Sequence, residues 1–475
     1  MTTNDAGRML RWAETAEAIG ATRATSRKSA IVAEYLRSLG DDDLAIAAVF
    51  LSGRPFPERD QRKAGLGWRA ITTVVQMVAG SDEGSLGRYY DRSSDVGTAV
   101  SALLTEVGHE PAGEPLELNE VAASFDRLAT TRGRDAKATV FADLLRRADP
   151  LSARYVTAIL GGELRIGLRE GHLEKGLAQA FERDLAEVQW AGMLTGDIGR
   201  TALLARVGTL DAARLSLFHP LKSMLASPVT DEAEALRRLK PPVWVEDKYD
   251  GIRAQLHREG DELRLFSRDL NDITGGFPEI VEAARAVTWE GILDGEILAW
   301  KDGAVLPFLQ LQTRIGRKRP SAAVLADVPV IYVAFDVLAL GEGSPPEPLL
   351  REPLHQRRRR LEALDLPATP GFGLAALVDA ADEAELERVF AAAQARGNEG
   401  LMLKYPDSIY APGRRGYAWL KLKKALTTLD CVVVGVEVGH GRRHGVLSDY
   451  TFAVLDDRIG AAEGSLVTVG KAYSG

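Results

Sequence analysis

The sequence has few of the residues and runs on which several kinds of function depend. It contains one cysteine, Cys431, which excludes an internal disulfide and any zinc site built on cysteines. Only seven histidines are available for metal binding or acid–base catalysis. No apolar run approaches the ~20 residues that a membrane-spanning helix needs. The N-terminus has neither signal-peptide nor transit-peptide character, so we expect a cytoplasmic protein, associated with the nucleoid if it is bacterial.

Common nucleotide-binding and protease motifs are also missing. The sequence has no G-x-x-x-x-G-K-[ST] phosphate-binding loop, and no G-x-G-x-x-G follows a predicted strand. The zinc-protease motif H-E-x-x-H is absent as well. A net charge of −8 argues only weakly against a polyanionic partner, because local basic surface matters more than the total. Four basic runs, each more typical of a solvated face than of a contact, lie at 314–320, 357–360, 413–416 and 441–444.

Length and hydrophobic periodicity indicate several domains, of which the first is helical. The apolar spacing of residues 1–215 is near 3.6, and alternating runs are scarce, so we expect an all-α N-terminal domain. One helix is predicted at 41–51, after an acidic start, and another within 151–168, beginning at a Ser cap and breaking at Gly161-Gly162. Two prolines within residues 215–231 interrupt the periodicity and indicate a linker.

Short alternating runs replace the helical pattern from about residue 240. Helical segments lie between them, and Gly260-Asp261 predicts a hairpin, so residues 216–428 read as an α+β domain with antiparallel sheet. Residues 429–475 contain two or three predicted strands. About 45 residues cannot close a small barrel, so we expect a partial all-β domain there, cut short.

Three predicted strands, at 243–248, 292–298 and 419–423, carry charge on one face and apolar residues on the other. The charges that share a face are Glu246 with Lys248, Asp294 with Glu296, and Lys421 with Lys423. The simplest explanation of this pattern is an amphipathic sheet with one solvent-exposed face. However, acid pairs hold divalent cations and lysine pairs hold phosphates, which together suit a nucleoside triphosphate with magnesium. Gly251 would allow close backbone approach beside Lys248, a common need where phosphate lies near main chain.

The stretch EDKYDGIR (246–253) resembles the nucleophile motif K-x-D-G-x-R of the covalent nucleotidyltransferases. Five more motifs of that superfamily follow in order: LFSRDLNDIT, LDGEIL, YVAFDVL, NEGLMLK and WLKLKK. KYDGIR and NEGLMLK look most like ATP-dependent DNA ligases. GGELRIGLREG in the helical region and PLKSMLASPV after it are similar to the DNA-binding domain and junction of the archaeal/eukaryotic-type branch. The resemblance covers nearly the whole chain.

The resemblance implies a role for each matching residue. Lys248 would be the nucleophile that becomes AMP-lysine, Glu246 would bind the adenine amino group, and Phe335 would stack on adenine. The residues implied to contact ribose or phosphates are Arg253, Arg268, Glu296, Arg415, Lys421 and Lys423, and those implied to bind metal are Glu296 and Glu399. Asp250 and Asp294 also fit the motifs, and a purely structural role stays open for both.

The implied function is ATP-dependent sealing of nicks in duplex DNA, through AMP-lysine and 5′-adenylated DNA intermediates. It would use Mg²⁺ or Mn²⁺, and a monomer would grip nicked duplex through phosphate contacts of the helical domain. This family usually ends with a complete OB-fold that carries a basic sixth motif. No such motif follows Lys423, and GRRHG (441–445) lies in a predicted turn. Self-adenylation is therefore expected to be impaired if the last domain is truncated.

Two other kinds of function remain open at this point. RNA ligases and capping-type guanylyltransferases share the nucleophile motif, but they do not usually carry a large helical domain ahead of it. A non-catalytic DNA-binding clamp with a decayed pocket is the alternative from another class, and the intact Lys248, Glu296 and Glu399 argue against it. An NAD-dependent ligase would need a four-cysteine zinc module, which one cysteine excludes.

Overall fold

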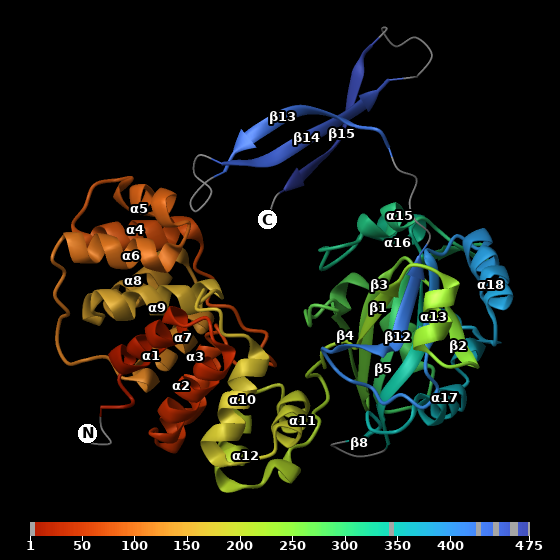
Figure 1. Cartoon of the computed structure of the whole chain (residues 1–475), viewed down its shortest axis with the longest axis horizontal. Coiled ribbons are helices and arrows are strands. Elements are labelled where there is room, and N and C mark those ends of the chain that lie inside the picture. The colour runs from red at the N-terminus through yellow and green to blue at the C-terminus, as the bar shows by residue number, and fades with distance from the viewer. Residues whose placement is uncertain (1–4, 342–345, 424–428, 440–445, 457–463, 474–475) are drawn as a thin grey trace. The chain divides into compact units, whose positions relative to one another are not determined.

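The computed structural model describes residues 5–341, 346–423, 429–439, 446–456 and 464–473 (Figure 1). Contacts divide the chain into two compact units, one of which comprises residues 193–196 and 213–425. The other contains most of the helical region and the C-terminal strands. The expected domain boundaries at 215/216 and 428/429 stay predictions. Among the described residues, no helix has the length and apolar character needed to cross a lipid bilayer.

The N-terminal region is all-α, as predicted. Its helices are α1 (Met9–Ala21), α2 (Thr25–Arg37), α3 (Asp41–Leu51), α4 (Trp68–Ala79), α5 (Ser85–Ser93), α6 (Val96–Glu106), α7 (Leu118–Thr130), α8 (Arg134–Arg147), α9 (Pro150–Gly161), α10 (Glu170–Phe181), α11 (Leu185–Thr195) and α12 (Ile198–Val207), with a 3₁₀ turn at Leu210–Ala212. Helices distant in sequence pack in pairs, notably α2 with α10, α6 with α9 and α3 with α12. The periodic apolar residues of these helices are the buried ones, which is why the 3.6 spacing identified them.

The predicted Ser cap of the helix within 151–168 is wrong. Helix α9 begins earlier, because Asp149 caps it by accepting hydrogen bonds from the backbone N–H groups of Leu151 (2.9 Å) and Ser152 (3.0 Å). Pro150 suits the first helical position, since its missing N–H would have had no partner there. The helix ends where predicted, with Gly162 in the left-handed conformation (φ 79°).

One sheet of the α+β domain has five strands: β1 (Leu225–Val229), β2 (Val243–Lys248), β10 (Leu377–Ala380), β11 (Gly400–Lys404) and β12 (Arg415–Lys423). Their order is β1-β12-β11-β2-β10, and every pairing is antiparallel except that of β1 with β12. Helices α13 (Glu232–Arg238) and α18 (Glu383–Ala395) pack on this sheet. They bury its apolar face, including Val243, Val245, Leu420 and Leu422, and leave the charged face of each strand to the other side.

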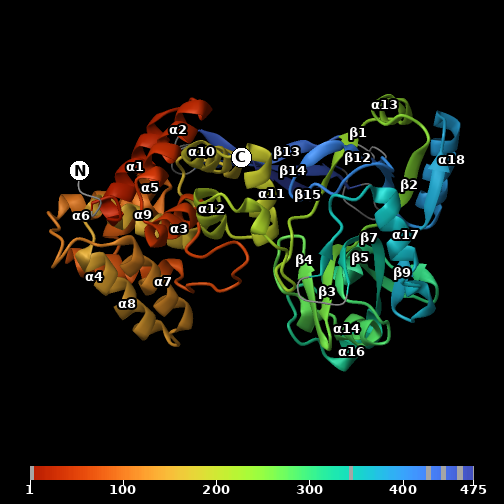
Figure 2. The ribbon, with the colours of Figure 1, turned by 90° about the horizontal axis from the view of Figure 1, so that it is seen from below.

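The second sheet contains β3 (Ile252–Glu259), β4 (Glu262–Ser267), β5 (Gly291–Lys301), β6 (Ala304–Val305), β7 (Val330–Leu340), β8 (Glu347–Pro348) and β9 (Phe372–Leu374). The main order is β4-β3-β5-β7-β8, with β6 beside β5 and β9 parallel to β7. The helices of this part are α14 (Pro278–Arg285), α15 (Phe308–Gln312), α16 (Ala322–Asp327) and α17 (Leu354–Glu362), with 3₁₀ turns at Thr274–Gly276 and Leu366–Ala368. Helices α14 and α17 pack against it (Figure 2). The predicted hairpin at Gly260-Asp261 joins β3 to β4.

The segment predicted as a linker is partly a strand. Residues 225–229 form β1, an edge strand that pairs with β12 alone among the described residues. Pro228 is tolerated because an edge strand needs fewer ladder hydrogen bonds than a central one. The segment before it is tied to β3: Gln255 exchanges two hydrogen bonds with the backbone of Leu221, and His257 accepts from the N–H of Phe218. It is therefore a fixed part of this unit.

The described part of the C-terminal region forms a three-stranded antiparallel sheet, β13 (Val432–Val438), β14 (Leu447–Leu455) and β15 (Leu466–Tyr473), in that order. This agrees with the expected partial OB-fold. The basic run at 441–445 lies outside the described residues.

Candidate functional site

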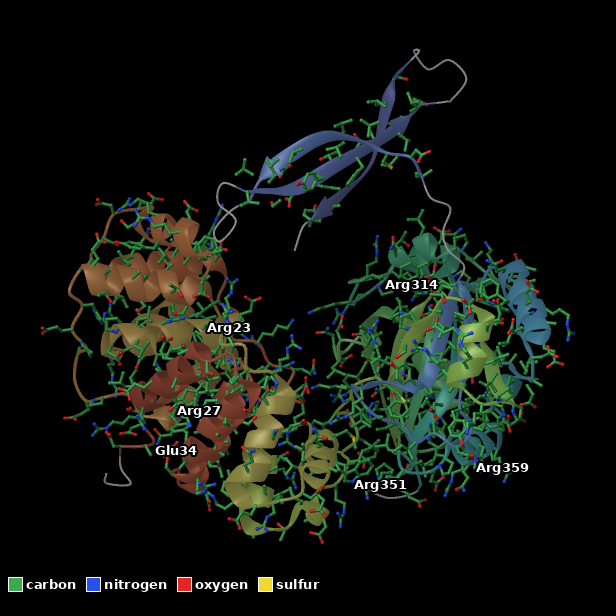
Figure 3. The ribbon with its side chains drawn as sticks, in the orientation of Figure 1. Arg23, Arg27, Glu34, Arg314, Arg351 and Arg359 are labelled. Atoms are coloured by element: carbon green, nitrogen blue, oxygen red, sulfur yellow. The ribbon has the colours of Figure 1, made fainter. Side chains whose placement is uncertain are left out.

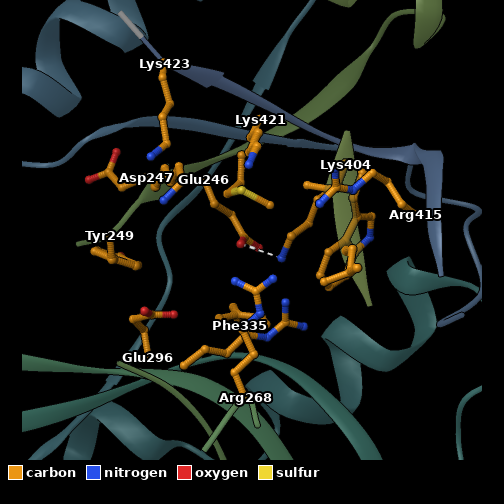
Figure 4. A pocket seen from close by; sticks show the side chains of 16 residues that line it. Glu246, Asp247, Tyr249, Arg268, Glu296, Phe335, Lys404, Arg415, Lys421 and Lys423 are labelled. Carbon is orange, nitrogen blue, oxygen red and sulfur yellow. Dashed lines mark hydrogen bonds and ion pairs between the residues drawn. The ribbon is translucent and has the colours of Figure 1, made fainter. Parts of the chain in front are cut away.

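A pocket lies between the two sheets of the α+β domain (Figure 4). Its lining comes from β1, β2, β11 and β12 on one side and from β3, β5 and β7 on the other, with Arg268 just after β4. All nine residues predicted to be catalytic or to contact the nucleotide line it: Glu246, Lys248, Arg253, Arg268, Glu296, Phe335, Arg415, Lys421 and Lys423. The pocket also contains residues to which the sequence gave no catalytic or ligand-binding role, namely Leu225, Ala226, Asp247, Tyr249, Met402, Lys404 and Trp419.

Strand register brings Glu399 between two lysines. Gly400 lies opposite Lys248 in β2 and opposite Lys423 in β12. A side chain at Gly400 would lie 2.2 Å from the carbonyl oxygen of Leu422, and its φ of 154° also disfavours other residues. Glu399 directly precedes this glycine, so its carboxylate forms ion pairs with both Lys248 and Lys423, the latter at 2.5 Å.

Asp247 fixes the segment that presents Glu399, although the sequence reasoning gave it no role. Its carboxylate accepts two hydrogen bonds from Arg396 (2.7 and 2.9 Å) and one from Asn398 (2.8 Å). The N–H of Glu399 also donates to the carbonyl oxygen of Lys248 at 2.9 Å. One clue was available in the sequence: alternation puts Asp247 on the apolar face of β2, where a carboxylate needs a partner.

Gly251 allows a close backbone approach, as expected, and the structure shows that the neighbour is strand β5. A Cβ at this position would lie 2.4 Å from the carbonyl oxygen of Ile297 and 2.8 Å from the side chain of Glu296. The glycine thus lets the turn after β2 approach β5, and this approach brings Lys248 and Glu296 to the same pocket.

The three acidic groups around Lys248 differ in electrostatic state. Burial raises the pKa of Glu296 to about 8, against the opposing charges of Arg253 and Lys248. Burial also raises the pKa of Asp250, and the neighbouring Glu399 carboxylate adds to the effect. Burial acts against ionisation of Glu399 too, but hydrogen bonds from the lysines hold its pKa below the usual range.

Arg253 is anchored by Asp294, one of the two acids left open by the sequence. The guanidinium donates to both carboxylate oxygens of Asp294 (3.1 and 2.7 Å) and to the carbonyl oxygen of Met224 (2.7 Å). Tyr410 donates to the same carboxylate at 2.7 Å. Asp294 is fully buried, so the structure gives it a positioning role. Held in this way, Arg253 lies over the ring of Phe335, 5.2 Å from its centre.

A basic cluster occupies the β12 side of the pocket. Burial lowers the pKa of Lys421, and the nearby charges of Lys423 and Arg415 lower it further, with a smaller contribution from Arg268. A polyanionic ligand would relieve this mutual repulsion between the cations, so the cluster favours binding of such a ligand. Phosphate groups fit it, because lysine and arginine supply charge and N–H donors together.

The carboxylates beside this cluster fit a divalent cation only in part. Glu296 and Glu399 offer hard oxygen ligands, and a cation would replace the proton that burial favours on Glu296. Within the described ranges, no group of three His, Cys, Asp or Glu side chains is arranged to hold a metal by itself. Magnesium commonly binds through one or two carboxylates plus substrate phosphates, which matches this donor set.

Two of the basic runs contain arginines with a structural role beside exposed ones. Arg357 is fully buried and donates to both oxygens of Asp336 (2.8 and 2.9 Å), while Arg358 is buried beside Glu362. Arg314 is also buried, donating to Glu279 and to backbone carbonyls. Arg359, in contrast, is exposed (Figure 3). Adjacent arginines in one run therefore have opposite environments.

Comparison with known proteins agrees with the geometry. The family model "ATP dependent DNA ligase domain" matches residues 223–423, and "DNA ligase N terminus" matches residues 9–178. A "Probable DNA ligase" from Koribacter versatilis is 44% identical, in an alignment covering 98% of this chain and 82% of the relative. A "DNA ligase" from Methanoculleus marisnigri is 36% identical, in an alignment covering 94% of this chain and 79% of the relative. The chain belongs to the ATP-dependent DNA ligase family.

The fold of the ligase has a solved counterpart as well. The structure named Pmar-Lig_PreS3 superimposes with a TM-score of 0.59 at 16% identity, covering 98% of this chain and 88% of that one. At this identity the likeness concerns the fold alone. The matched adenylation segment, 223–423, starts two residues before β1 and ends at the last residue of β12.

Proposed function

We propose that this ligase uses the pocket to carry AMP from ATP to a nick in duplex DNA, with Lys248 as the covalent carrier. The observation that carries the proposal is the convergence of residues from all six motifs on one pocket. Lys248 lies there with the basic residues of β12, which suit phosphate groups, and with Glu246 and Phe335, which suit adenine.

The proposed reaction has three transfers. Lys248 Nζ forms a bond to the α-phosphorus of ATP, and pyrophosphate leaves. A 5′-phosphate oxygen of the nick then attacks the same phosphorus and releases the lysine. The 3′-hydroxyl finally attacks the 5′-phosphorus, forming the phosphodiester bond and releasing AMP. Arg415, Lys421 and Lys423 would stabilise the charge that develops on the phosphates.

A divalent cation, Mg²⁺ or Mn²⁺, is proposed to bind Glu296 and Glu399. When bound, it would neutralise phosphate charge and act as a Lewis acid. Glu399 would have to exchange its lysine partners for the ion, which links cation binding to release of the Lys248 amine. We further propose that the protein acts as a monomer in the cytoplasm.

The direct test is a sealing assay on a fluorescent duplex with a single 5′-phosphorylated nick. With ATP and Mg²⁺ the ligase should join the strands, and it should do so on a pre-adenylated nick without ATP. An absence of sealing in both cases, with tight binding to the nick retained, would support a non-catalytic clamp. Preferential joining of single-stranded RNA, or transfer of GMP to RNA ends, would support the other nucleotidyltransferases. Binding to nicked duplex should weaken as salt rises.

A further inference from the structure

Lys404 lines the pocket, but it has no role so far as a nucleophile, a metal ligand or a phosphate-binding residue. It is the last residue of β11, and its side chain is 1% exposed. Its ammonium group lies 2.5 Å from Oε2 of Glu246, which is 5% exposed, as the dashed line in Figure 4 shows. The same ammonium lies 4.8 Å from the ring centre of Phe335 and 4.5 Å from that of Trp419.

This arrangement follows from strand register. Met402 in β11 lies opposite Glu246 in β2, and Lys404 lies two residues further along the same face. Lys404 is also directly opposite Trp419 in β12. The lysine is therefore enclosed by its own sheet on two sides, and Phe335 covers it from the facing sheet. A cation placed over two rings and beside one carboxylate has few alternative positions.

The ionisation of Glu246 depends on this neighbour. Burial raises the pKa of Glu246, and the charge and hydrogen bond of Lys404 are the largest effects opposing it. Arg358 from α17 opposes it less, with its guanidinium 3.7 Å from Oε1, while Asp336 from β7 raises it. Tyr249, next along from β2, is neutral in this range because burial raises its pKa to well above neutrality. Without the lysine, a proton on Glu246 becomes the favoured way to bury this carboxyl.

The protonation state of Glu246 decides which purine it can bind. A carboxylate only accepts hydrogen bonds, so it pairs with the 6-amino group of adenine and repels the 6-oxo group of guanine or hypoxanthine. A protonated carboxyl can donate, and would therefore tolerate a 6-oxo group. We propose that Lys404 is a specificity-determining residue. Its ion pair keeps Glu246 ionised and fixed in orientation, so that the pocket rejects 6-oxopurine nucleotides. This rests on the proposed function, in which Glu246 contacts the base.

The test compares ATP with ITP, which differs in carrying an oxo group at position 6. Rates of covalent nucleotidylation would be measured from pH 6 to 9 for the wild type, Lys404→Met and Lys404→Arg, with exposed Lys240→Met as the matched control. The wild type and Lys240→Met should prefer ATP by about 10³-fold or more in kcat/KM, since a site that hydrogen-bonds a substrate group rejects analogues lacking it. Lys404→Met should reduce the ratio of kcat/KM for ATP to kcat/KM for ITP at least tenfold, mainly by raising the KM for ATP. The rate of Lys404→Met with ATP should increase towards that of the wild type as pH rises. Lys404→Arg should restore the preference for ATP.

A second variant covers the case in which Lys404→Met does not fold. The double variant Glu246→Gln/Lys404→Met removes both buried charges, a change that proteins often tolerate better than loss of one partner. Its amide can donate to a 6-oxo group, so it should use ITP at least as well as ATP, with no pH dependence of the ratio. An unchanged ATP preference in either variant overturns the inference. If the wild type labels with neither nucleotide and also fails to seal a pre-adenylated nick, the proposed function itself fails, which is a different result.

Discussion

Lys248 forms an ion pair with Glu399, and the carboxylate oxygen that contacts it also lies 2.5 Å from the ammonium group of Lys423. The predicted nucleophile is thus paired with a carboxylate that also holds a second lysine of the pocket. In the proposed function, nucleotide phosphates would compete for Lys423, and a divalent cation would compete for Glu399. Binding of the nucleotide together with the cation would therefore loosen the contact between Lys248 and Glu399.

Replacement of Glu399 should show whether this carboxylate serves the chemistry. We expect Glu399→Gln to slow nucleotidylation by about 10²-fold, the size of effect found when one preorganised electrostatic contact is removed. The loss should not be recovered by raising the ATP concentration, although higher Mg²⁺ should recover part of it. Glu387→Gln, at an exposed position in α18, is the control and should behave as wild type. An active Glu399→Gln with unchanged Mg²⁺ dependence would show that Glu399 only anchors the lysines.

The stability of the α+β domain should depend on the buried pair of Arg357 and Asp336. Arg357→Met leaves a buried carboxylate without its partner, which should destabilise the domain by about 3–5 kcal/mol. Arg359→Met, two residues along the same helix but exposed, should change stability by less than about 0.5 kcal/mol. Calorimetric unfolding of both variants measures the difference. The double variant Arg357→Met/Asp336→Leu should regain part of the loss, and equal stability of the two single variants would contradict the assignment.

His257 should make this domain sensitive to acid. It is fully buried, and burial lowers its pKa to about 3, with a smaller effect from His219. The unfolded chain binds a proton at this residue below pH 6.5 and the folded chain does not, so stability falls as pH decreases from 6.5 towards 3. The loss should reach about 2 kcal/mol at pH 5.

The matching variant is His257→Gln, whose side-chain oxygen can still accept from the N–H of Phe218. Its unfolding temperature should decrease less between pH 7 and pH 5 than that of the wild type. Parallel curves for the two proteins would mean that other groups cause the acid sensitivity.

The features that were predictable from sequence depend on local periodicity. Alternation correctly placed Glu246 with Lys248 and Lys421 with Lys423 on one face, because a strand has a fixed period of two and one face was apolar. The motif order then indicated that these faces meet. Roles assigned to individual contacts, such as adenine binding by Glu246, stay predictions.

The features that were missed depend on partners far away in sequence. Strand β1 is five residues long and contains a proline, so only its pairing with β12 identifies it. Arg357 is buried because Asp336 lies beside it, and nothing in the run 357–360 distinguishes it from the exposed Arg359 and Arg360. Lys404 likewise belonged to a recognised motif, but its contact with Glu246 follows from the register of two strands.

The central claim is that Lys248 carries AMP taken from ATP. Incubation of the ligase with Mg²⁺ and α-³²P-labelled ATP, GTP or NAD, followed by denaturing gel electrophoresis and peptide mapping, tests it most directly. We predict acid-labile label from ATP alone, located at Lys248, and none in Lys248→Ala, while Lys240→Ala is labelled as wild type. Label from GTP, or label that persists in Lys248→Ala, would contradict the account.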